Sequence, residues 1–136
     1  MNEKITALLE DLNSLHNKRL LEIDIDCYVE KIIKNAAILC HFDRGNLEAF
    51  IAYYCNDPQK ETSYLTMLAV SPQAQRKGLG RRLLQFVIEN LKSTGFRHLW
   101  LEVLKDNVKA IQLYESAGFT IARSTSEGKI AMEISL

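Results

Sequence analysis

Val70-Ser71-Pro72-Gln73-Ala74-Gln75-Arg76-Lys77-Gly78-Leu79-Gly80-Arg81-Arg82-Leu83-Leu84 is the stretch that decides the fold. An apolar run from Leu65 to Val70 leads into it, and apolar residues with helical spacing follow at 83, 84, 87, 88 and 91. The first amides of a helix have no partners within the helix, and the positive end of its dipole lies behind them. The stretch therefore predicts a strand, a glycine turn and a helix start that together bind an anion.

The composition of the turn supports this anion site. Gly78 and Gly80 carry no Cβ, so a phosphate oxygen can approach the backbone closely. Four cationic side chains add positive charge at the rim: Arg76, Lys77, Arg81 and Arg82. The plain alternative is an ordinary helix start with a solvated basic face.

Three ligand classes use such a turn. A mononucleotide P-loop requires Gly-x-x-x-x-Gly-Lys-Ser/Thr, which is absent. A dinucleotide fold requires Gly-x-Gly-x-x-Gly, but Leu83 stands at the third glycine position, although Glu102 falls near the distance of that fold's ribose-binding acid. The third class of ligand is coenzyme A, whose pyrophosphate would bind at the turn.

The bulk properties narrow the function. The 136 residues suit one compact domain, residues 1–136, with the composition of a globular protein. The formal net charge is zero, which argues against a general nucleic-acid binder. No apolar run approaches a membrane span, and the N-terminus lacks a secretory pattern, so we expect a cytoplasmic protein that binds no membrane.

The cysteines and histidines predict no metal site. No Cys-x-x-Cys pair occurs, and neither a zinc site nor a cysteine nucleophile has support from the spacing. We expect buried, reduced thiols, with two of them inside apolar strands. The residues concerned are Cys27, Cys40, Cys55, His16, His41 and His98.

The order of elements predicts an α/β domain with a mixed sheet. It has too few strand–helix–strand units for a doubly wound dinucleotide domain. The strand at 61–70 is expected to be central and covered on both faces, and the last strand to be a possible edge. In the second helix Tyr28 and Ile32 should face inward, with Ile33 a further candidate. We expect helices at 3–15, 24–35, 79–93 and 107–118, and strands at 37–42, 47–55, 61–70, 97–104, 119–123 and 129–136.

A second motif runs from Glu102 to Phe119 and contains Asn107-x-x-Ala110-x-x-Leu113-Tyr114-x-x-x-Gly118-Phe119. Both motifs resemble the conserved blocks of the GCN5-related N-acetyltransferases (GNAT): Gln-x-x-Gly-x-Gly after a strand, and Asn-x-x-Ala-x-x-Leu/Phe-Tyr-x-x-x-Gly-Phe. Together they cover residues 63–119. Members of the family usually open with a strand, whereas residues 1–15 look helical. The resemblance therefore does not say how the N-terminal region would contribute to binding the acceptor.

The resemblance implies a single-domain GNAT-like fold whose mixed, mostly antiparallel sheet splays at the strands that end near Val70 and Leu104. Acetyl-CoA would lie in that opening as co-substrate, with no metal. The main chain of residues 68–70 would bind the pantetheine arm, amides around residues 76–81 the pyrophosphate, and Asn107 the arm or its loop. The implied cofactor-binding residues are Leu68, Ala69, Val70, Gln75, Arg76, Lys77, Gly78, Leu79, Gly80, Arg81, Asn107, Ala110 and Tyr114.

The same resemblance assigns the catalytic roles. Glu102 is the candidate base that removes a proton from the attacking amine, and Tyr114 the acid that serves the leaving thiolate. Because Glu102 shares a strand face with Trp100, partial burial is expected to raise its pKa. The alternatives are a structural Glu102 with a water chain as base, and a Tyr114 that belongs to the core. Asn107 can also be a helix cap. We assign no chemical role to four aromatic residues, which are expected to lie in the core or in the wall of the pocket: Tyr53, Tyr54, Tyr64 and Trp100.

The expected function is acetyl transfer to a primary amine of a small metabolite, such as an amino sugar, by direct attack in a ternary complex. Acetylation of a protein N-terminus or lysine is the alternative. Glu102 lies twelve residues before Tyr114, which resembles ribosomal-protein N-terminal acetyltransferases, but residues 124–136 lack their tyrosine-rich segment. A non-catalytic acyl-CoA-binding regulator is the alternative of another class. The chain is expected to be a monomer or homodimer.

Overall fold

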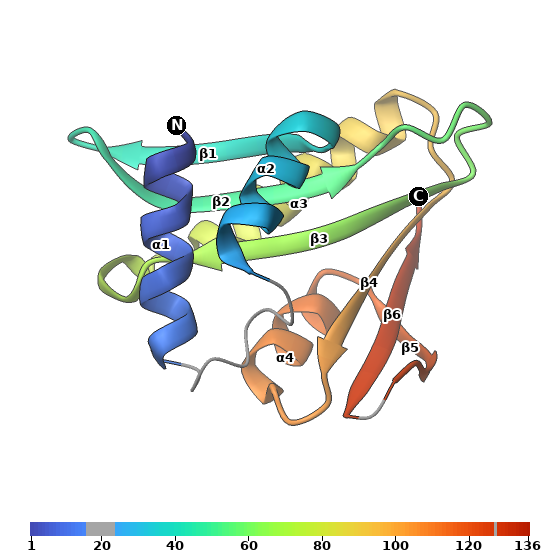
Figure 1. The fold of residues 1–136 in the computed structure, drawn as a ribbon. Helices are drawn as coiled ribbons and strands as arrows, with labels where there is room; N and C mark the ends of the chain where they lie inside the picture. Colours follow the sequence, from blue (N-terminus) through green and yellow to red (C-terminus); the bar gives the residue numbers. More distant parts are fainter. Residues whose placement is uncertain (16–23, 127) are drawn as a thin grey trace. The chain divides into compact units, whose positions relative to one another are not determined.

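The computed structural model describes residues 1–15, 24–126 and 128–136, and it shows an α/β fold with a mixed six-stranded sheet flanked by helices (Figure 1). The strands follow the order β1-β2-β3-β4-β6-β5, and β3 and β4 run parallel. The predicted order of elements is confirmed; residues 16–23, with His16, lie outside the described residues. The elements are α1 (Asn2–Leu15), α2 (Ile25–Asn35), β1 (Ala37–Asp43), β2 (Asn46–Tyr54), β3 (Thr62–Val70), a 3-10 turn (Pro72–Ala74), α3 (Leu79–Ser93), β4 (His98–Leu104), α4 (Val108–Ser116), β5 (Thr120–Ser124) and β6 (Lys129–Ser135).

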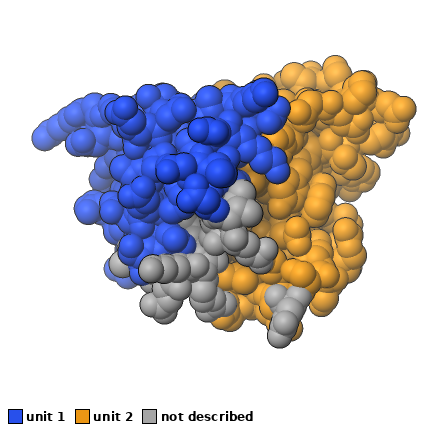
Figure 2. Space-filling model, viewed as in Figure 1, with its two compact units in different colours: residues 1–53, 67–83 blue, residues 54–66, 84–136 orange. Residues whose placement is uncertain are grey.

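The chain divides into two compact units, which Figure 2 shows in different colours. The N-terminal unit consists of residues 1–53 and 67–83, and the C-terminal unit of residues 54–66 and 84–136. The division therefore passes through β3 and α3.

In the N-terminal unit, α1 and α2 lie side by side on one face of the β1–β2 hairpin (Figure 1). Asp24 caps α2 by accepting a hydrogen bond from the amide of Cys27 at 3.2 Å. Tyr28 and Ile32 are buried as predicted, whereas Ile33 is 38% exposed and lies outside the core. Burial of each large apolar side chain contributes roughly 1.5–3 kcal/mol. The core consists of Ile5, Leu8, Leu9, Leu12, Tyr28, Val29, Ile32, Phe50, Ala52, Met67 and Ala69.

The β1–β2 hairpin turns at residues 43–46, between the strands predicted at 37–42 and 47–55. Its two central residues, Arg44 and Gly45, both have positive φ, of 51° and 81°. Two such residues match the right-handed twist of the strands that they join. The local sequence therefore sets this turn.

Strand β3 is third of six in the sheet, so its predicted central place is confirmed. The prediction that both faces are covered is wrong. Alternate residues are buried, while Tyr64, Leu68 and Val70 on the other face are only half-buried. An apolar run predicts burial but cannot say whether a layer of protein covers both faces. The buried set is Ser63, Leu65, Met67 and Ala69.

In the C-terminal unit, β6 lies between β4 and β5. Residues 98–104 of β4 pair with residues 129–135 of β6, and β5 pairs with the other side of β6. The last strand is therefore an interior strand, and the prediction of an open edge there is wrong. The reason is that the β5–β6 hairpin places its second strand, not its first, against β4.

Helix α3 buries the predicted apolar stripe at residues 83, 84, 87, 88 and 91. It ends where predicted, because Gly95 adopts a φ of 95° and its amide bonds the carbonyl of Lys92 at 3.1 Å. The amide of Phe96 bonds the carbonyl of Leu91 at 3.0 Å. These two bonds and the left-handed glycine form the common helix stop that satisfies the last carbonyls.

The three cysteines are free, but the expected burial is wrong. Cys40 is half-buried, and Cys27 and Cys55 are exposed. Cys55 directly follows the end of β2, so it falls outside the strand that was expected to bury it. Among the helices that the structure describes, none has the length and apolar content needed to span a membrane.

Candidate active site

The predicted anion cradle occupies residues 75–80 of the N-terminal unit. Arg76 and Gly78 have left-handed φ values of 71° and 76°, whereas Lys77 between them does not have a positive φ. Alternation of this kind turns successive amides toward one side and forms a concavity that suits an anion. Helix α3 begins at Leu79, so its unpaired first amides follow directly.

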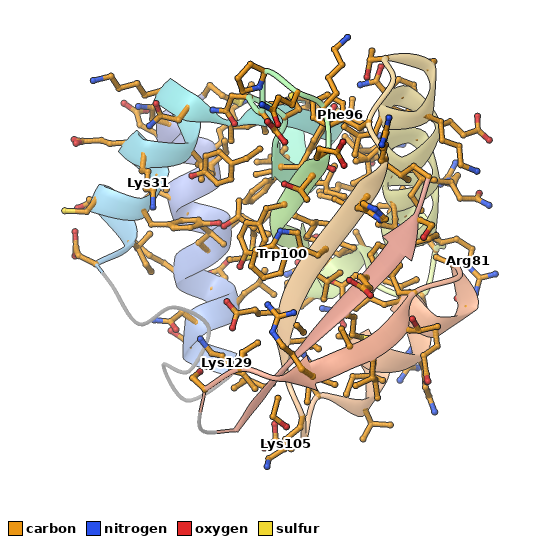
Figure 3. All side chains as sticks on the ribbon, turned by 90° about the vertical axis from the view of Figure 1, so that its right-hand side faces the viewer. Lys31, Arg81, Phe96, Trp100, Lys105 and Lys129 are labelled. Carbon is orange, nitrogen blue, oxygen red and sulfur yellow. The ribbon has the colours of Figure 1, made fainter. Side chains whose placement is uncertain are left out.

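Gly78 leaves open space beside the backbone. A Cβ built on it would meet no atom within 4 Å, and the residue is exposed. Gly80 instead lies in the first turn of α3 and does not have a positive φ, so the turn itself does not require a glycine there. Arg81 extends outward from the same turn (Figure 3), while Leu79 is buried and anchors the helix start.

The end of β3 lies beside this cradle in the sequence. Ala69 is buried, and Leu68 and Val70 are half-buried. The side-chain amide of Gln75 donates a hydrogen bond to the carbonyl of Val70 at 3.2 Å. This bond ties the first residue of the glycine motif to the strand that precedes it.

In the C-terminal unit, Asn107 begins α4. Its Oδ1 accepts a hydrogen bond from the amide of Ala110 at 3.3 Å, so the cap role is confirmed. Tyr114 lies near the other end of α4, 8% exposed, with its ring centroid 5.6 Å from that of Phe119. Burial, with a smaller contribution from Tyr64, raises the pKa of Tyr114 to about 12. The hydroxyl therefore keeps its proton at neutral pH.

Glu102 lies on β4 on the same face as half-buried Trp100, which Figure 3 labels. The side chain of Glu102 is exposed, so the expected partial burial is wrong. It lies on the outward face of β4, whereas Leu99, Leu101 and Val103 are buried.

Tyr64 is a residue to which the sequence assigned no chemistry. Its ring lies 4.4 Å from that of Trp100, centroid to centroid, because the parallel register of β3 and β4 makes them neighbours. Burial raises the pKa of Tyr64, and the charge of Glu102 adds to that rise. Tyr64 therefore interacts electrostatically with both Glu102 and Tyr114. Only strand pairing reveals this, since no local pattern marks the residue.

A hollow of about 250 Å³ lies on the face of the sheet that carries Glu102. Its lining includes Trp100, Arg123, Ala131 and Glu133. Ala131 pairs with Glu102 on one side and with Arg123 on the other, and directly paired residues share a face. Because whole-ligand pockets usually measure about 300–1,000 Å³, the hollow suits one group of an acceptor.

The described ranges contain no group of three or more histidine, cysteine or acidic side chains arranged to hold a metal ion. The residues that the resemblance assigns to cofactor binding or catalysis fall into two sets. Residues 68–70 and 75–81 belong to the N-terminal unit, and Glu102, Asn107, Ala110 and Tyr114 to the C-terminal unit.

Comparisons with known proteins agree with these features. The family model described as "Acetyltransferase (GNAT) family" matches residues 5–119. The ribosomal protein bS18-alanine N-acetyltransferase of Escherichia coli K12 is 48% identical over 68 residues, 46% of each chain. The chain thus spans about half the length of the curated relatives that it matches.

Solved structures give the same fold. The crystal structure of the ribosomal-protein-S18-alanine N-acetyltransferase from Escherichia coli has a TM-score of 0.71 and 29% identity, and the match covers 86% of this chain and 79% of that one. The PaiA N-acetyltransferase of Thermoplasma acidophilum, solved in complex with coenzyme A, has a TM-score of 0.81, covering 99% and 92%, and at 19% identity supports the fold alone. The two motifs, the mixed sheet and the family match over most of its length show that the chain belongs to the GNAT family of acetyltransferases.

Proposed function

We propose that the chain transfers an acetyl group from acetyl-CoA to the α-amine of a polypeptide N-terminus. The observation that carries the choice of acceptor is the exposure of Glu102 on an open strand face. Two relatives support it as well, because their names describe them as alanine N-acetyltransferases of a ribosomal protein.

The protonation of amines favours an α-amine. A nucleophilic amine must be neutral, and α-amines have pKa values near 7.7–8.0, against about 10.4 for lysine. Near neutral pH an appreciable fraction of α-amines is therefore already neutral, whereas a lysine must first lose its proton. An exposed carboxylate such as Glu102 is enough to receive the proton from an α-amine, directly or through one water.

In the proposed reaction, the amine nitrogen forms a bond to the acetyl carbon while the carbon–sulfur bond breaks. Glu102 takes the proton that the amine loses. Tyr114 donates its hydroxyl hydrogen to the sulfur as negative charge develops there. Because the pKa of Tyr114 is about 12 and that of an ordinary thiol about 8.5, the hydroxyl stabilises the thiolate by hydrogen bonding more readily than by complete proton transfer.

The cradle supplies binding. Amides of residues 76–81 and the dipole of α3 would hold the pyrophosphate, as the left-handed residues Arg76 and Gly78 allow. The backbone of residues 68–70, in the same unit, would hold the pantetheine arm. These groups bind and orient the co-substrate, and no covalent enzyme intermediate is required.

A small-metabolite amine is the second candidate, and the size of the hollow favours it. About 250 Å³ accommodates a compact group on the sheet face that carries Glu102, and the lining of the hollow combines an aromatic ring with both charges, Arg123 and Glu133. A small amine with polar substituents, such as an amino sugar, could place them there.

We also propose that the protein works in the cytoplasm, which the three free cysteines support.

A panel of acceptors tests the proposal through release of free thiol from acetyl-CoA. The first peptide has a free N-terminal alanine and no lysine. The second differs from it by a blocked N-terminus and the replacement of one internal residue by lysine, and glucosamine represents small amines. We expect product from the first peptide, at least tenfold more than from the second at pH 7.5. Turnover of glucosamine alone would favour the second candidate, and turnover of none of them would contradict the proposed acceptors.

A further inference from the structure

Glu48, on β2, contacts both ends of the loop that leads into the cradle. Its backbone carbonyl accepts a hydrogen bond from the amide of Ser71 at 2.8 Å. Its carboxylate oxygen Oε2 lies 3.7 Å from Nζ of Lys77. Residues 71 and 77 are the two ends of the segment between β3 and the glycine turn, so one residue of a neighbouring strand holds both.

The carboxylate of Glu48 is mostly buried, with 16% of its side chain exposed, whereas 54% of the Lys77 side chain is exposed. The second oxygen, Oε1, lies 3.7 Å from Nε2 of His41 on β1. A carboxylate that is largely removed from water has a fixed position and needs its partners, because an unpaired buried charge is unfavourable. Glu48 therefore provides a rigid point to which Lys77 is attached.

The loop needs such an attachment. Arg76 adopts a φ of 71°, which is unfavourable for a residue with a side chain. Unfavourable backbone conformations persist where the surrounding structure holds them. Both neighbours of Arg76 are held by a strand. Lys77 pairs with Glu48 of β2, and Gln75 bonds the carbonyl of Val70 of β3.

We propose that Glu48 is a positioning residue for acetyl-CoA: through Lys77 and Ser71 it holds residues 75–78 in the conformation, left-handed at Arg76 and Gly78, that aims their amides at the pyrophosphate. The proposal rests on the proposed binding of pyrophosphate at residues 76–81. The proposal predicts a change in acetyl-CoA affinity opposite to the one expected from charge alone. Removal of a negative charge near a diphosphate should strengthen binding by simple electrostatics, yet loss of this carboxylate should weaken it.

The experiment measures acetyl-CoA affinity by calorimetry for the whole chain. We expect Glu48→Gln and Lys77→Met each to weaken binding roughly tenfold, which is within the range of coupling between contacting residues, and the double variant to be no weaker than either single one. Lys77→Arg keeps the charge and reach and should restore affinity. Glu61→Gln is the control, since it removes the same charge from a carboxylate that pairs with Arg97 at 3.2 Å and belongs to the C-terminal unit.

Other outcomes would overturn the proposal. Tighter binding by Glu48→Gln would mean that Glu48 competes with the pyrophosphate for Lys77. Additive losses in the double variant would mean that Lys77 binds the ligand independently of Glu48. A loss of melting temperature with unchanged affinity would leave Glu48 a purely structural role. If the wild type itself does not bind acetyl-CoA, the proposed function fails instead, so the two failures are distinguishable.

Discussion

Gly78→Ala gives a direct test of the cradle, because the structure supplies a matched control in the same unit. Gly78 has a φ of 76° and Gly45, in the β1–β2 turn, a φ of 81°. A Cβ on either residue would meet no atom within 4 Å. Alanine at both sites should therefore suffer the same backbone strain, about 1–2 kcal/mol, and no steric clash within the protein.

The two variants should differ only in what they bind. Both should lower the melting temperature by a similar amount, roughly 3–10 °C for a domain of this size. A Cβ at residue 78 projects into the open space where the pyrophosphate is proposed to approach. Loss of one hydrogen bond to a charged group is worth about 1.5–3 kcal/mol, so acetyl-CoA affinity should fall roughly 10- to 150-fold in Gly78→Ala. Gly45→Ala should keep wild-type affinity.

Thermal unfolding and calorimetry on both variants provide the measurements. Equal affinities in Gly78→Ala and Gly45→Ala would refute the cradle, since the added methyl group would then meet no ligand. Unequal losses of stability would refute the argument that strain at the two turns is equivalent. A weaker Gly45→Ala would point to a general effect of destabilisation on binding.

Four further predictions concern the ligand and the catalytic pair. Acetyl-CoA well above its dissociation constant should raise the melting temperature, and NAD should not; a shift with NAD alone would reverse that assignment. Tyr114→Phe should lower turnover roughly 10²-fold with little change in acetyl-CoA affinity. Full turnover, measured where chemistry is rate-limiting, would mean that Tyr114 only packs in the core. The raised pKa of Tyr114, about 12, stabilises the fold below pH 10, and this contribution disappears as the pH rises toward 12, because the unfolded chain ionises first. Wild type should therefore lose roughly 2–3 kcal/mol more unfolding free energy than Tyr114→Phe over that range in urea titrations, and parallel curves would contradict the burial argument. Glu102→Gln should depress turnover most near neutral pH and less at high pH, where more amine is neutral; a profile that overlays wild type would point to another base.

The sequence by itself determined the elements whose cause is local. The hairpin at residues 43–46, the helix start near residue 107, and the helix stop at Gly95 each depend on residues within one turn of each other. The glycine turn before α3 is of the same kind, and so are the apolar stripe of α3 and the alternation in β4. Such features can be predicted because hydrogen bonds and steric limits between near neighbours decide them.

Only the tertiary structure decided which strands and side chains become neighbours. It placed β6 inside the sheet, left Glu102 exposed, and brought Tyr64 against Trp100. It also set Glu48 of β2 against Lys77. These contacts join residues far apart in the sequence, and a strand's own pattern of apolar residues is the same whichever strand it pairs with and whether one face or two are covered. The cradle at residues 75–80 can therefore be predicted from one short segment. The contact that supports it, and the surroundings of the candidate base, depend on which strands become neighbours.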